Sequence, residues 1–248
     1  MSMNSAALRE LLGLEGKVAL VAGGAGGIGS VVVRRLLDAG AAVVAADLPG
    51  RRVPDGAAAV PCDLRAPEEI ERLVSRVSAD HGRLDVLVHC AGVARDSVIW
   101  KMETSAWEEV LAINLDSAFH LLKAAAPLMR RTGNGSVVLV ASINGERGKF
   151  GLANYAASKA GLMALGKTAA AELGRSGVRV NSVAPGWIDT PMTAGLPAEA
   201  RARAEAESLL GRLGEPDDVA RVVLFLCAPL SRHVTGQVIR VDGGQLTA

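Results

Sequence analysis

The sequence predicts an α/β fold in which a single parallel sheet of about seven strands carries helices on both faces. Short runs rich in valine and alanine alternate along the chain with longer segments of helical periodicity, a pattern typical of a doubly wound sheet. Strands that are buried on both faces have such uninterrupted apolar runs. No repeat, low-complexity stretch or linker divides the chain, so we expect one domain over residues 1–248.

Six apolar runs of five or six residues are predicted as strands, at residues 17–22, 42–46, 84–89, 136–141, 178–183 and 237–241. Helices are predicted between most of them, at residues 28–39, 67–81, 107–131, 154–175 and 216–227. Residues 190–214 interrupt the alternation, because they hold two prolines, three glycines and a charged stretch. We expect this segment to form a small lid over the carboxyl edge of the sheet.

The charge balance excludes several classes of function. Lysine and arginine total 27 against 26 acidic residues, and the arginines are scattered, so we expect no nucleic acid and no membrane surface as partner. No apolar run approaches the roughly 18 residues that span a bilayer, and residues 1–15 do not read as a secretory signal. We therefore expect a cytoplasmic protein with a small-molecule partner.

The cysteines and histidines give no sign of a metal site. Cys62, Cys90 and Cys227 are odd in number and widely spaced, and none has a second cysteine or a histidine at zinc-ligand spacing. The four histidines of the chain are equally isolated. We predict reduced thiols, structural or surface histidines and no metal.

A glycine-rich turn, AGGAGGIG at residues 22–29, joins the first strand to the first helix. Its glycines fall where the amides of a helix N-terminus could bind a dinucleotide pyrophosphate. Asp47 ends the second strand, where a carboxylate can accept hydrogen bonds from both adenosine ribose hydroxyls. A 2′-phosphate about 4 Å away would meet repulsion of about 4 kcal/mol at an effective dielectric near 20, so Asp47 favours NAD. Arg51 and Arg52 could reach such a phosphate and leave NADP use open.

Tyr155 is the only tyrosine of the chain, and Lys159 follows it by one helical turn. A phenol loses its proton near pH 10, so it needs a nearby positive charge to act as a base at neutral pH. Ser142 ends the strand that precedes this helix, and Asn114 lies in an earlier helical segment. Hydride transfer to or from an alcohol carbon needs one group to exchange the hydroxyl proton and another to polarise the oxygen. Tyr155 and Ser142 suit these two roles, with Lys159 lowering the pKa of Tyr155 and holding the nicotinamide ribose.

The glycine spacing and the order Asn114, Ser142, Tyr155, Lys159 resemble the short-chain dehydrogenase/reductase family. The resemblance covers nearly the whole chain and implies a Rossmann-type fold with bound NAD. It also implies that Asn114 supports a water in a proton relay that starts at Lys159. The cofactor-binding positions that it implies are Gly23, Gly27, Ile28, Gly29, Asp47, Leu48, Asp63, Leu64, Ala91, Gly92, Tyr155, Lys159, Pro185, Gly186, Ile188 and Thr190.

Four positions depart from the family pattern or allow another interpretation. Ala22 stands where a threonine is usual, and His89-Cys90 stands where two asparagines are usual, although neither change removes a catalytic atom. Asp63 is expected beside the adenine, but aspartate also forms turns by itself. These positions affect the fine geometry of the cofactor loops.

Segments 96–102, 151–155 and 185–193 are most similar to 3-oxoacyl-[acyl-carrier-protein] and acetoacetyl-CoA reductases within the family. Those relatives usually use NADPH, whereas Asp47 and Gly26 favour NAD here. The resemblance implies a 3-hydroxyacyl or 3-oxoacyl thioester substrate. A dehydrogenase of cyclic or steroid-like alcohols is the alternative enzyme, and a non-catalytic NAD(H) sensor is the alternative of another class.

Six residues next to the matched positions are predicted to form the substrate wall, although core packing is the other interpretation: Ile143, Asn144, Phe150, Trp187, Met192 and Leu196. Arg147 and Lys149 could meet an anionic substrate. Family resemblance also implies a homotetramer built on the helix at 154–175 and its neighbour before the fifth strand, with a dimer as the alternative that the sequence leaves open.

Overall fold

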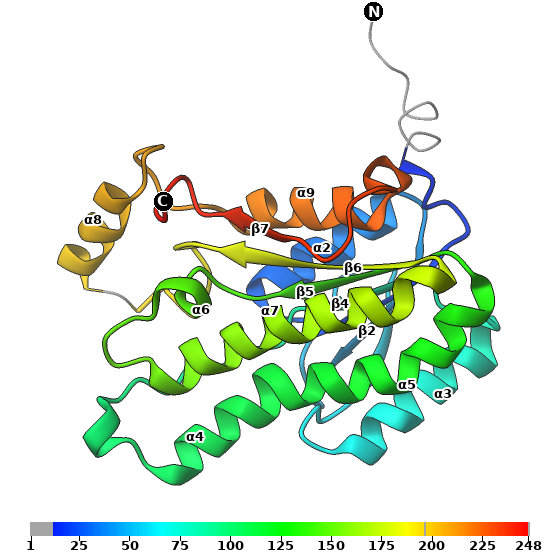
Figure 1. The fold of residues 1–248 in the computed structure, drawn as a ribbon, viewed down its shortest axis with the longest axis horizontal. Coiled ribbons are helices and arrows are strands. Elements are labelled where there is room, and N and C mark those ends of the chain that lie inside the picture. Colours follow the sequence, from blue (N-terminus) through cyan, green and yellow to red (C-terminus); the bar gives the residue numbers. More distant parts are fainter. Residues whose placement is uncertain (1–11, 196, 248) are drawn as a thin grey trace, which may run out of the picture.

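One sheet lies between two layers of helices in the computed structural model, which describes residues 12–195 and 197–247 (Figure 1). Its seven strands are all parallel and follow the order β3-β2-β1-β4-β5-β6-β7. The strands are β1 (Val18–Ala22), β2 (Ala42–Asp47), β3 (Ala58–Pro61), β4 (Val86–His89), β5 (Gly135–Val140), β6 (Val178–Pro185) and β7 (Val238–Val241). The predicted doubly wound α/β class is confirmed. The strand order reverses between β1 and β4, where folds of this class bind their ligands.

Each face of the sheet has its own apolar core. On one face α2 (Gly27–Asp38) and α9 (Pro216–Cys227) pack side by side, with Val32 and Leu36 of α2 in the same buried cluster as Val223 of α9. The other face is covered by α3 (Pro67–His81), α5 (Ser117–Thr132) and α7 (Ala153–Leu173). Of these helices, α3 and α5 have the apolar stripe that a 3.6-residue period places on one side.

The strand β3 is the one that the six apolar runs did not reveal. It lies at the edge of the sheet, and three of its four residues are exposed. An edge strand that buries little carries no strong apolar pattern. The other six strands lie within two residues of the predicted ends.

The single helix predicted at residues 107–131 is wrong in detail. The structure has α4 (Thr104–Leu111), a π-helical turn η2 (Ala112–Asp116) and then α5. The Ser117 amide bonds the Ala112 carbonyl, one residue further back than an α-helix would use. The apolar period continues through this turn, so the sequence pattern reads as one helix.

Short helices stand beyond the ends toward which the strand arrows point (Figure 1). They are α6 (Asn144–Arg147), after β5, and α8 (Ala198–Glu207), in the segment predicted as a lid. Only Ala204 of α8 is buried. No helix in the described part of the chain is long and apolar enough to cross a membrane.

Candidate active site

A cavity of about 400 Å³ opens at the carboxyl ends of the strands, and most of the predicted site residues line it. The predicted residues in its wall are Gly27, Ile28, Gly29, Gly92, Ser142, Ile143, Asn144, Tyr155, Lys159, Pro185, Gly186, Trp187, Ile188, Thr190 and Met192. The predicted residues outside this lining are Gly23, Asp47, Leu48, Asp63, Leu64, Ala91, Asn114 and Phe150. Leu196 lies outside the described residues.

A side chain would collide with backbone atoms at two positions of the glycine loop. Gly23 has φ +79°, and a Cβ on it would lie 2.6 Å from the Ala91 amide nitrogen. A Cβ on Gly29 would overlap the carbonyl oxygen of Gly23. The loop, the start of α2 and the segment after β4 therefore form a cradle of backbone, which fits the pyrophosphate and nicotinamide ends of a dinucleotide.

Asp47 ties the end of β2 to this glycine loop. One carboxylate oxygen accepts the amide of Ala25 at 2.9 Å, and the other accepts the amide of Leu48 at 2.9 Å. The guanidinium of Arg51 lies 3.9 Å from the same carboxylate. Asp47 thus stands beside the glycine loop, and its contact with the ribose stays a prediction.

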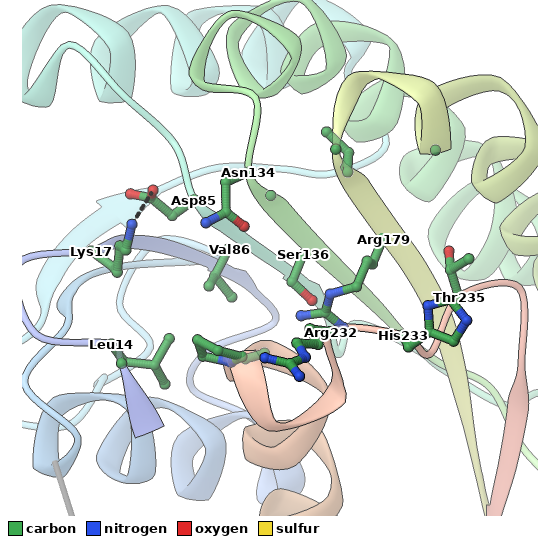
Figure 2. A pocket seen from close by; sticks show the side chains of 17 residues that line it. Leu14, Lys17, Asp85, Val86, Asn134, Ser136, Arg179, Arg232, His233 and Thr235 are labelled. Atoms are coloured by element: carbon green, nitrogen blue, oxygen red, sulfur yellow. Dashed lines mark ion pairs between the residues drawn. The ribbon is translucent and has the colours of Figure 1, made fainter. Parts of the chain in front are cut away.

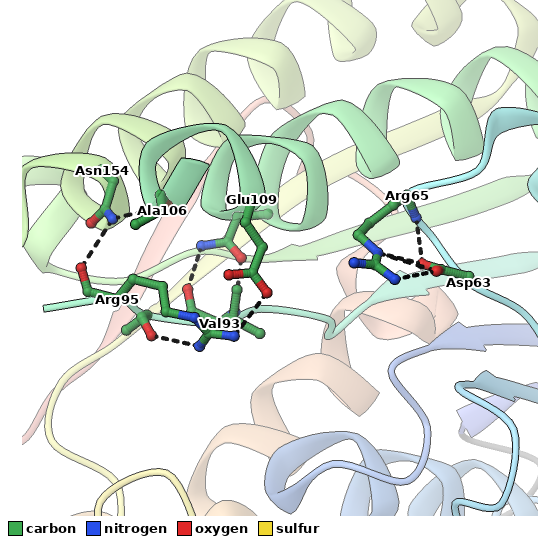
Figure 3. A network of polar contacts seen from close by, with 9 residues as sticks. Asp63, Arg65, Val93, Arg95, Ala106, Glu109 and Asn154 are labelled. Atoms are coloured by element: carbon green, nitrogen blue, oxygen red, sulfur yellow. Dashed lines mark hydrogen bonds and ion pairs between the residues drawn. The ribbon is translucent and has the colours of Figure 1, made fainter. Parts of the chain in front are cut away.

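Asp63 has a local hydrogen-bonding role in the structure. Its carboxylate accepts the Arg65 amide at 3.0 Å and pairs with the Arg65 guanidinium at 2.6 Å (Figure 3). These bonds hold the pKa of Asp63 below its usual range. The turn-forming alternative is therefore realised, and the adenine contact of Asp63 stays a prediction.

Ser142, Tyr155 and Lys159 meet in the wall of the cavity from two elements. Ser142 follows β5 and is buried, and its Oγ accepts the Asn144 amide at 3.2 Å. Lys159 lies one turn after Tyr155 on α7, with its Nζ 5.7 Å from the centre of the Tyr155 ring. The Lys159 ammonium donates to the Val140 carbonyl at 2.8 Å, so it is fixed to the end of β5.

Burial controls the protonation of both α7 side chains. It raises the pKa of the Tyr155 phenol, while a hydrogen bond with Ser142 acts in the opposite direction. We expected the neighbouring Lys159 to lower the pKa of Tyr155, but the pKa is raised. The effect of burial is larger than that of the hydrogen bond with Ser142, and the Lys159 ammonium is bonded to the Val140 carbonyl. Burial also lowers the pKa of Lys159 to about 8.

Asn114 lies in the π-helical turn and is fully buried. Its Oδ1 accepts the Val93 amide at 2.8 Å, and its Nδ2 donates to the Val93 carbonyl at 3.0 Å. The second Nδ2 hydrogen goes to Ser158 Oγ at 3.0 Å, and Ser158 in turn donates to the Tyr155 carbonyl. Asn114 therefore joins the segment after β4 to the helix that carries Tyr155 and Lys159.

Asn154 has a positioning role that the sequence reasoning missed. Its Nδ2 donates to the carbonyls of Arg95, at 3.0 Å, and Ala106, at 3.3 Å (Figure 3). Its Oδ1 accepts the Tyr155 amide. The Arg95 side chain pairs with Glu109 in the same network. The sequence indicates this role only by the place of Asn154, directly before Tyr155 at the start of a predicted helix, where asparagine often acts as a cap.

Known proteins similar to this chain indicate its family. A family described as Enoyl-(Acyl carrier protein) reductase matches residues 23–245. The 3-oxoacyl-[acyl-carrier-protein] reductase FabG of Thermotoga maritima is 41% identical over 246 residues, which cover 93% of this chain and 98% of that reductase. The (3R)-3-hydroxyacyl-CoA dehydrogenase of Mus musculus is 40% identical over 252 residues, 94% of this chain and 97% of its own. A short-chain type dehydrogenase/reductase from Mycobacterium ulcerans superposes with a TM-score of 0.89 at 36% identity, over 94% of this chain and 90% of its own.

The chain belongs to the short-chain dehydrogenase/reductase family. The resemblance drawn from the sequence is thereby confirmed, and with it a nicotinamide-dependent oxidoreductase acting on CH–OH groups. The roles of the individual site residues stay predictions.

The substrate side of this short-chain dehydrogenase/reductase site is only partly as predicted. Phe150, predicted for the substrate wall, is 84% exposed and stands outside the cavity lining. The Lys149 ammonium lies 3.9 Å above the Trp187 ring, a cation–π contact in the wall. Arg147 pairs with Glu207 of α8 at 3.3 Å, which joins the wall to the predicted lid. Asp96 and Leu152 also line the cavity and were not in the predicted site.

A second cavity, of about 470 Å³, lies at the opposite edge of the sheet (Figure 2). Lys17 and Asp85 form an ion pair of 3.5 Å in its wall, and Arg179 donates to Ser231 and the Ala228 carbonyl. None of the predicted site residues lines it. Within residues 12–195 and 197–247, no group of three or more His, Cys, Asp or Glu side chains is arranged to hold a metal ion.

Proposed function

We propose that the protein interconverts 3-hydroxyacyl and 3-oxoacyl thioesters with NAD(H). The observation that carries the proposal is the meeting of Ser142, Tyr155 and Lys159 in one cavity, beside a glycine cradle at the switch point of the sheet. The names of the Thermotoga maritima and Mus musculus relatives support an acyl-thioester substrate. A cytoplasmic location and a homotetrameric assembly belong to the same proposal.

Tyr155 is the general acid and base in this proposal. During ketone reduction its hydroxyl gives a proton to the carbonyl oxygen, and during alcohol oxidation the phenolate takes that proton back. A bound nicotinamide would supply or accept the hydride. The Ser142 hydroxyl donates to the reacting oxygen, which draws charge onto that oxygen as the bond changes. Both groups lie in the wall of one cavity, as this division of roles requires.

Lys159 stabilises the phenolate of Tyr155 and holds the ribose of the cofactor. Its ammonium is buried 5.7 Å from the centre of the Tyr155 ring, and the Val140 carbonyl takes only one of its three hydrogens, so the others could serve a phenolate or a ribose. A pKa of about 8 keeps most of the side chain protonated at pH 7. Asn114 supports the proton relay from this lysine. Lys159 and Asn114 lie close together beside Gly92. A Cβ on Gly92 would lie 3.2 Å from Lys159 Nζ and 3.5 Å from Asn114 Oδ1.

The deciding experiment follows the near-ultraviolet absorbance of the reduced nicotinamide with acetoacetyl-CoA, using wild type and Y155F. We expect rapid loss of NADH absorbance with wild type and at least about a 100-fold slower loss with Y155F, since general acid catalysis contributes 10²–10⁴-fold. The Y155F variant keeps the aromatic ring and removes only the hydroxyl, so its loss of activity reports on the hydroxyl alone. No turnover of acyl thioesters, together with turnover of cyclic alcohols, would replace the proposed substrate class.

Cofactor choice is tested at Asp47. In wild type we expect NADH to give a kcat/KM at least about 10-fold above that of NADPH, because a 2′-phosphate would meet the carboxylate. D47S should narrow or invert that ratio, since Arg51 already lies 3.9 Å from the carboxylate and could then pair with the phosphate. D38N, which removes an exposed carboxylate from the far end of α2, is the charge-matched control. Equal activity with both cofactors in wild type would contradict the NAD preference.

A further inference from the structure

A buried hydrogen-bonded chain links the end of β4 to the π-helical turn η2. His89, the last residue of β4, is fully buried, and its Nε2 lies 2.7 Å from Ser117 Oγ. The Ser117 hydroxyl donates to the carbonyl of Ile113 at 2.6 Å. The three groups therefore form a continuous path from the sheet to the turn that carries Asn114.

The hydrogen-bonded path ends at the Ile113 carbonyl, which loses its usual amide partner, Ser117, in the π turn. In an α-helix the Ser117 amide would bond Ile113, but here it bonds the Ala112 carbonyl instead. The Ser117 hydroxyl supplies a bond to Ile113 in its place. Side chains that insert into the helical ladder in this way stabilise a local change of helix geometry.

The chemistry of the path fixes the state of the histidine. A carbonyl can only accept, so the single Ser117 hydroxyl proton points to Ile113, and His89 Nε2 must donate to Ser117. The neutral ring then has a bare Nδ1, which has no hydrogen-bond partner within the described residues. Burial lowers the pKa of His89 to about 3, so the ring stays neutral at physiological pH. Burying the Nδ1 acceptor without a partner is unfavourable. We infer that the ring is kept for its Nε2 bond to Ser117.

We propose that His89 and Ser117 are positioning residues, which hold the π-helical turn and thereby the Asn114 carboxamide on Val93. The segment from His89 to Val93 is bonded to the same turn at both ends, through Ser117 at one and Asn114 at the other. Ala91 and Gly92, two predicted cofactor contacts, lie between these two bonds. The link to catalysis rests on the proposed role of Asn114, whereas the positioning itself does not.

Amide hydrogen exchange at Val93 tests the positioning directly, because this amide donates to Asn114. We expect S117A and H89L to raise its exchange rate at least about 10-fold, as local opening no longer needs to break the path. H89Q should restore slow exchange, since the glutamine amide can donate to Ser117 from a similar reach.

S136A is the matched control. Ser136 is also buried, and its hydroxyl also donates to a backbone carbonyl, that of Leu226 at 2.8 Å, but at the opposite edge of the sheet. We expect S136A to lower the melting temperature about as much as S117A while leaving Val93 exchange unchanged. Unchanged Val93 exchange in folded S117A and H89L, or equal acceleration in S136A, would overturn the proposal.

Kinetics separates the positioning from the proposed function. With acetoacetyl-CoA and NADH, we expect S117A and H89L each to lower kcat about 10-fold at nearly unchanged KM, and to raise the solvent isotope effect on kcat. The double variant should be no slower than either single variant, because residues that act as one unit are not additive. If the wild type does not turn over acetoacetyl-CoA while Val93 exchange changes as predicted, the proposed substrate class is rejected and the positioning role of His89 and Ser117 stands. Wild-type kinetics in both variants would reject the link to catalysis.

Discussion

Lys159 is a buried cation whose main bond is to a neutral carbonyl. Its side chain is 3% exposed, and burial brings its pKa from 10.5 to about 8. Such a group is held in the folded protein at a cost in stability, which is typical of residues kept for function. At the residue scale, the site therefore trades stability for a charge beside Tyr155.

We expect K159M to unfold at higher denaturant, with a gain of about 2 kcal/mol at pH 7 and loss of turnover. The folded pKa lies below the unfolded one, so the penalty is complete below pH 8 and is relieved between about pH 8 and 10.5. The advantage of K159M should therefore shrink across that window. Urea unfolding at pH 7 and pH 10 measures it, with K123M on the exposed side of α5 as control. An equal or lower midpoint for K159M at pH 7 would contradict this account.

At the scale of elements, the two helices on one face of the sheet are joined by a charged contact at their ends. Arg35, in the last turn of α2, makes two hydrogen bonds of 2.7 and 2.8 Å to Asp217, in the first turn of α9. Arg221 bonds the same carboxylate. These bonds lower the pKa of Asp217 to about 2.

We expect D217N to destabilise the protein by about 1 kcal/mol at pH 7, a value reduced for the partial exposure of the pair. The folded pKa is depressed, so this contribution is present above about pH 4 and is lost as pH falls toward 2. Thermal unfolding of both proteins between pH 7 and 2.5 should show the two curves converge. D80N, which breaks a more exposed pair with Arg76 on α3, should have little effect at any pH. A constant difference at all pH values would show that the ion pair is not the cause.

Local sequence was enough to predict the strands that are buried along their whole length. It was not enough to predict features that depend on contacts with distant residues. The strands of the sheet centre and the glycine loop have patterns that chemistry alone can interpret. The π turn was missed, because residues 107–131 have the pattern of one helical segment and the contact of Ser117 with His89 is 28 residues away. The positioning role of Asn154 also depends on distant carbonyls, those of Arg95 and Ala106.

At the scale of the whole molecule, one layer of helices presents large apolar side chains to the outside. Trp107 on α4 is 37% exposed and Phe119 on α5 is 48% exposed. Both belong to the helices before β5, where the proposed homotetramer would be built (Figure 1). Exposed aromatic residues on adjoining helices are typical of interfaces.

We expect the native mass of the wild type to be four chain masses and F119E to give smaller species, because the interface would have to bury a charge. A79E is the control, since Ala79 is an exposed residue of α3 and the change adds the same charge. Native mass spectrometry of the three proteins measures the result. A tetramer that persists in F119E would place the interface elsewhere.

The helix α8 offers the core a single buried side chain, Ala204. Two ion pairs join it to the rest of the molecule: Glu207 with Arg147 of the cavity wall, and Arg201 with Asp189, which lies between the wall residues Ile188 and Thr190. Burial of apolar surface hardly responds to salt, whereas attraction between partly exposed charges is screened over about 8 Å at 0.15 M and about 3 Å at 1 M. Ionic strength should therefore regulate how readily substrate enters. A KM that changes with sodium chloride is the expected signature of a gate held by charge.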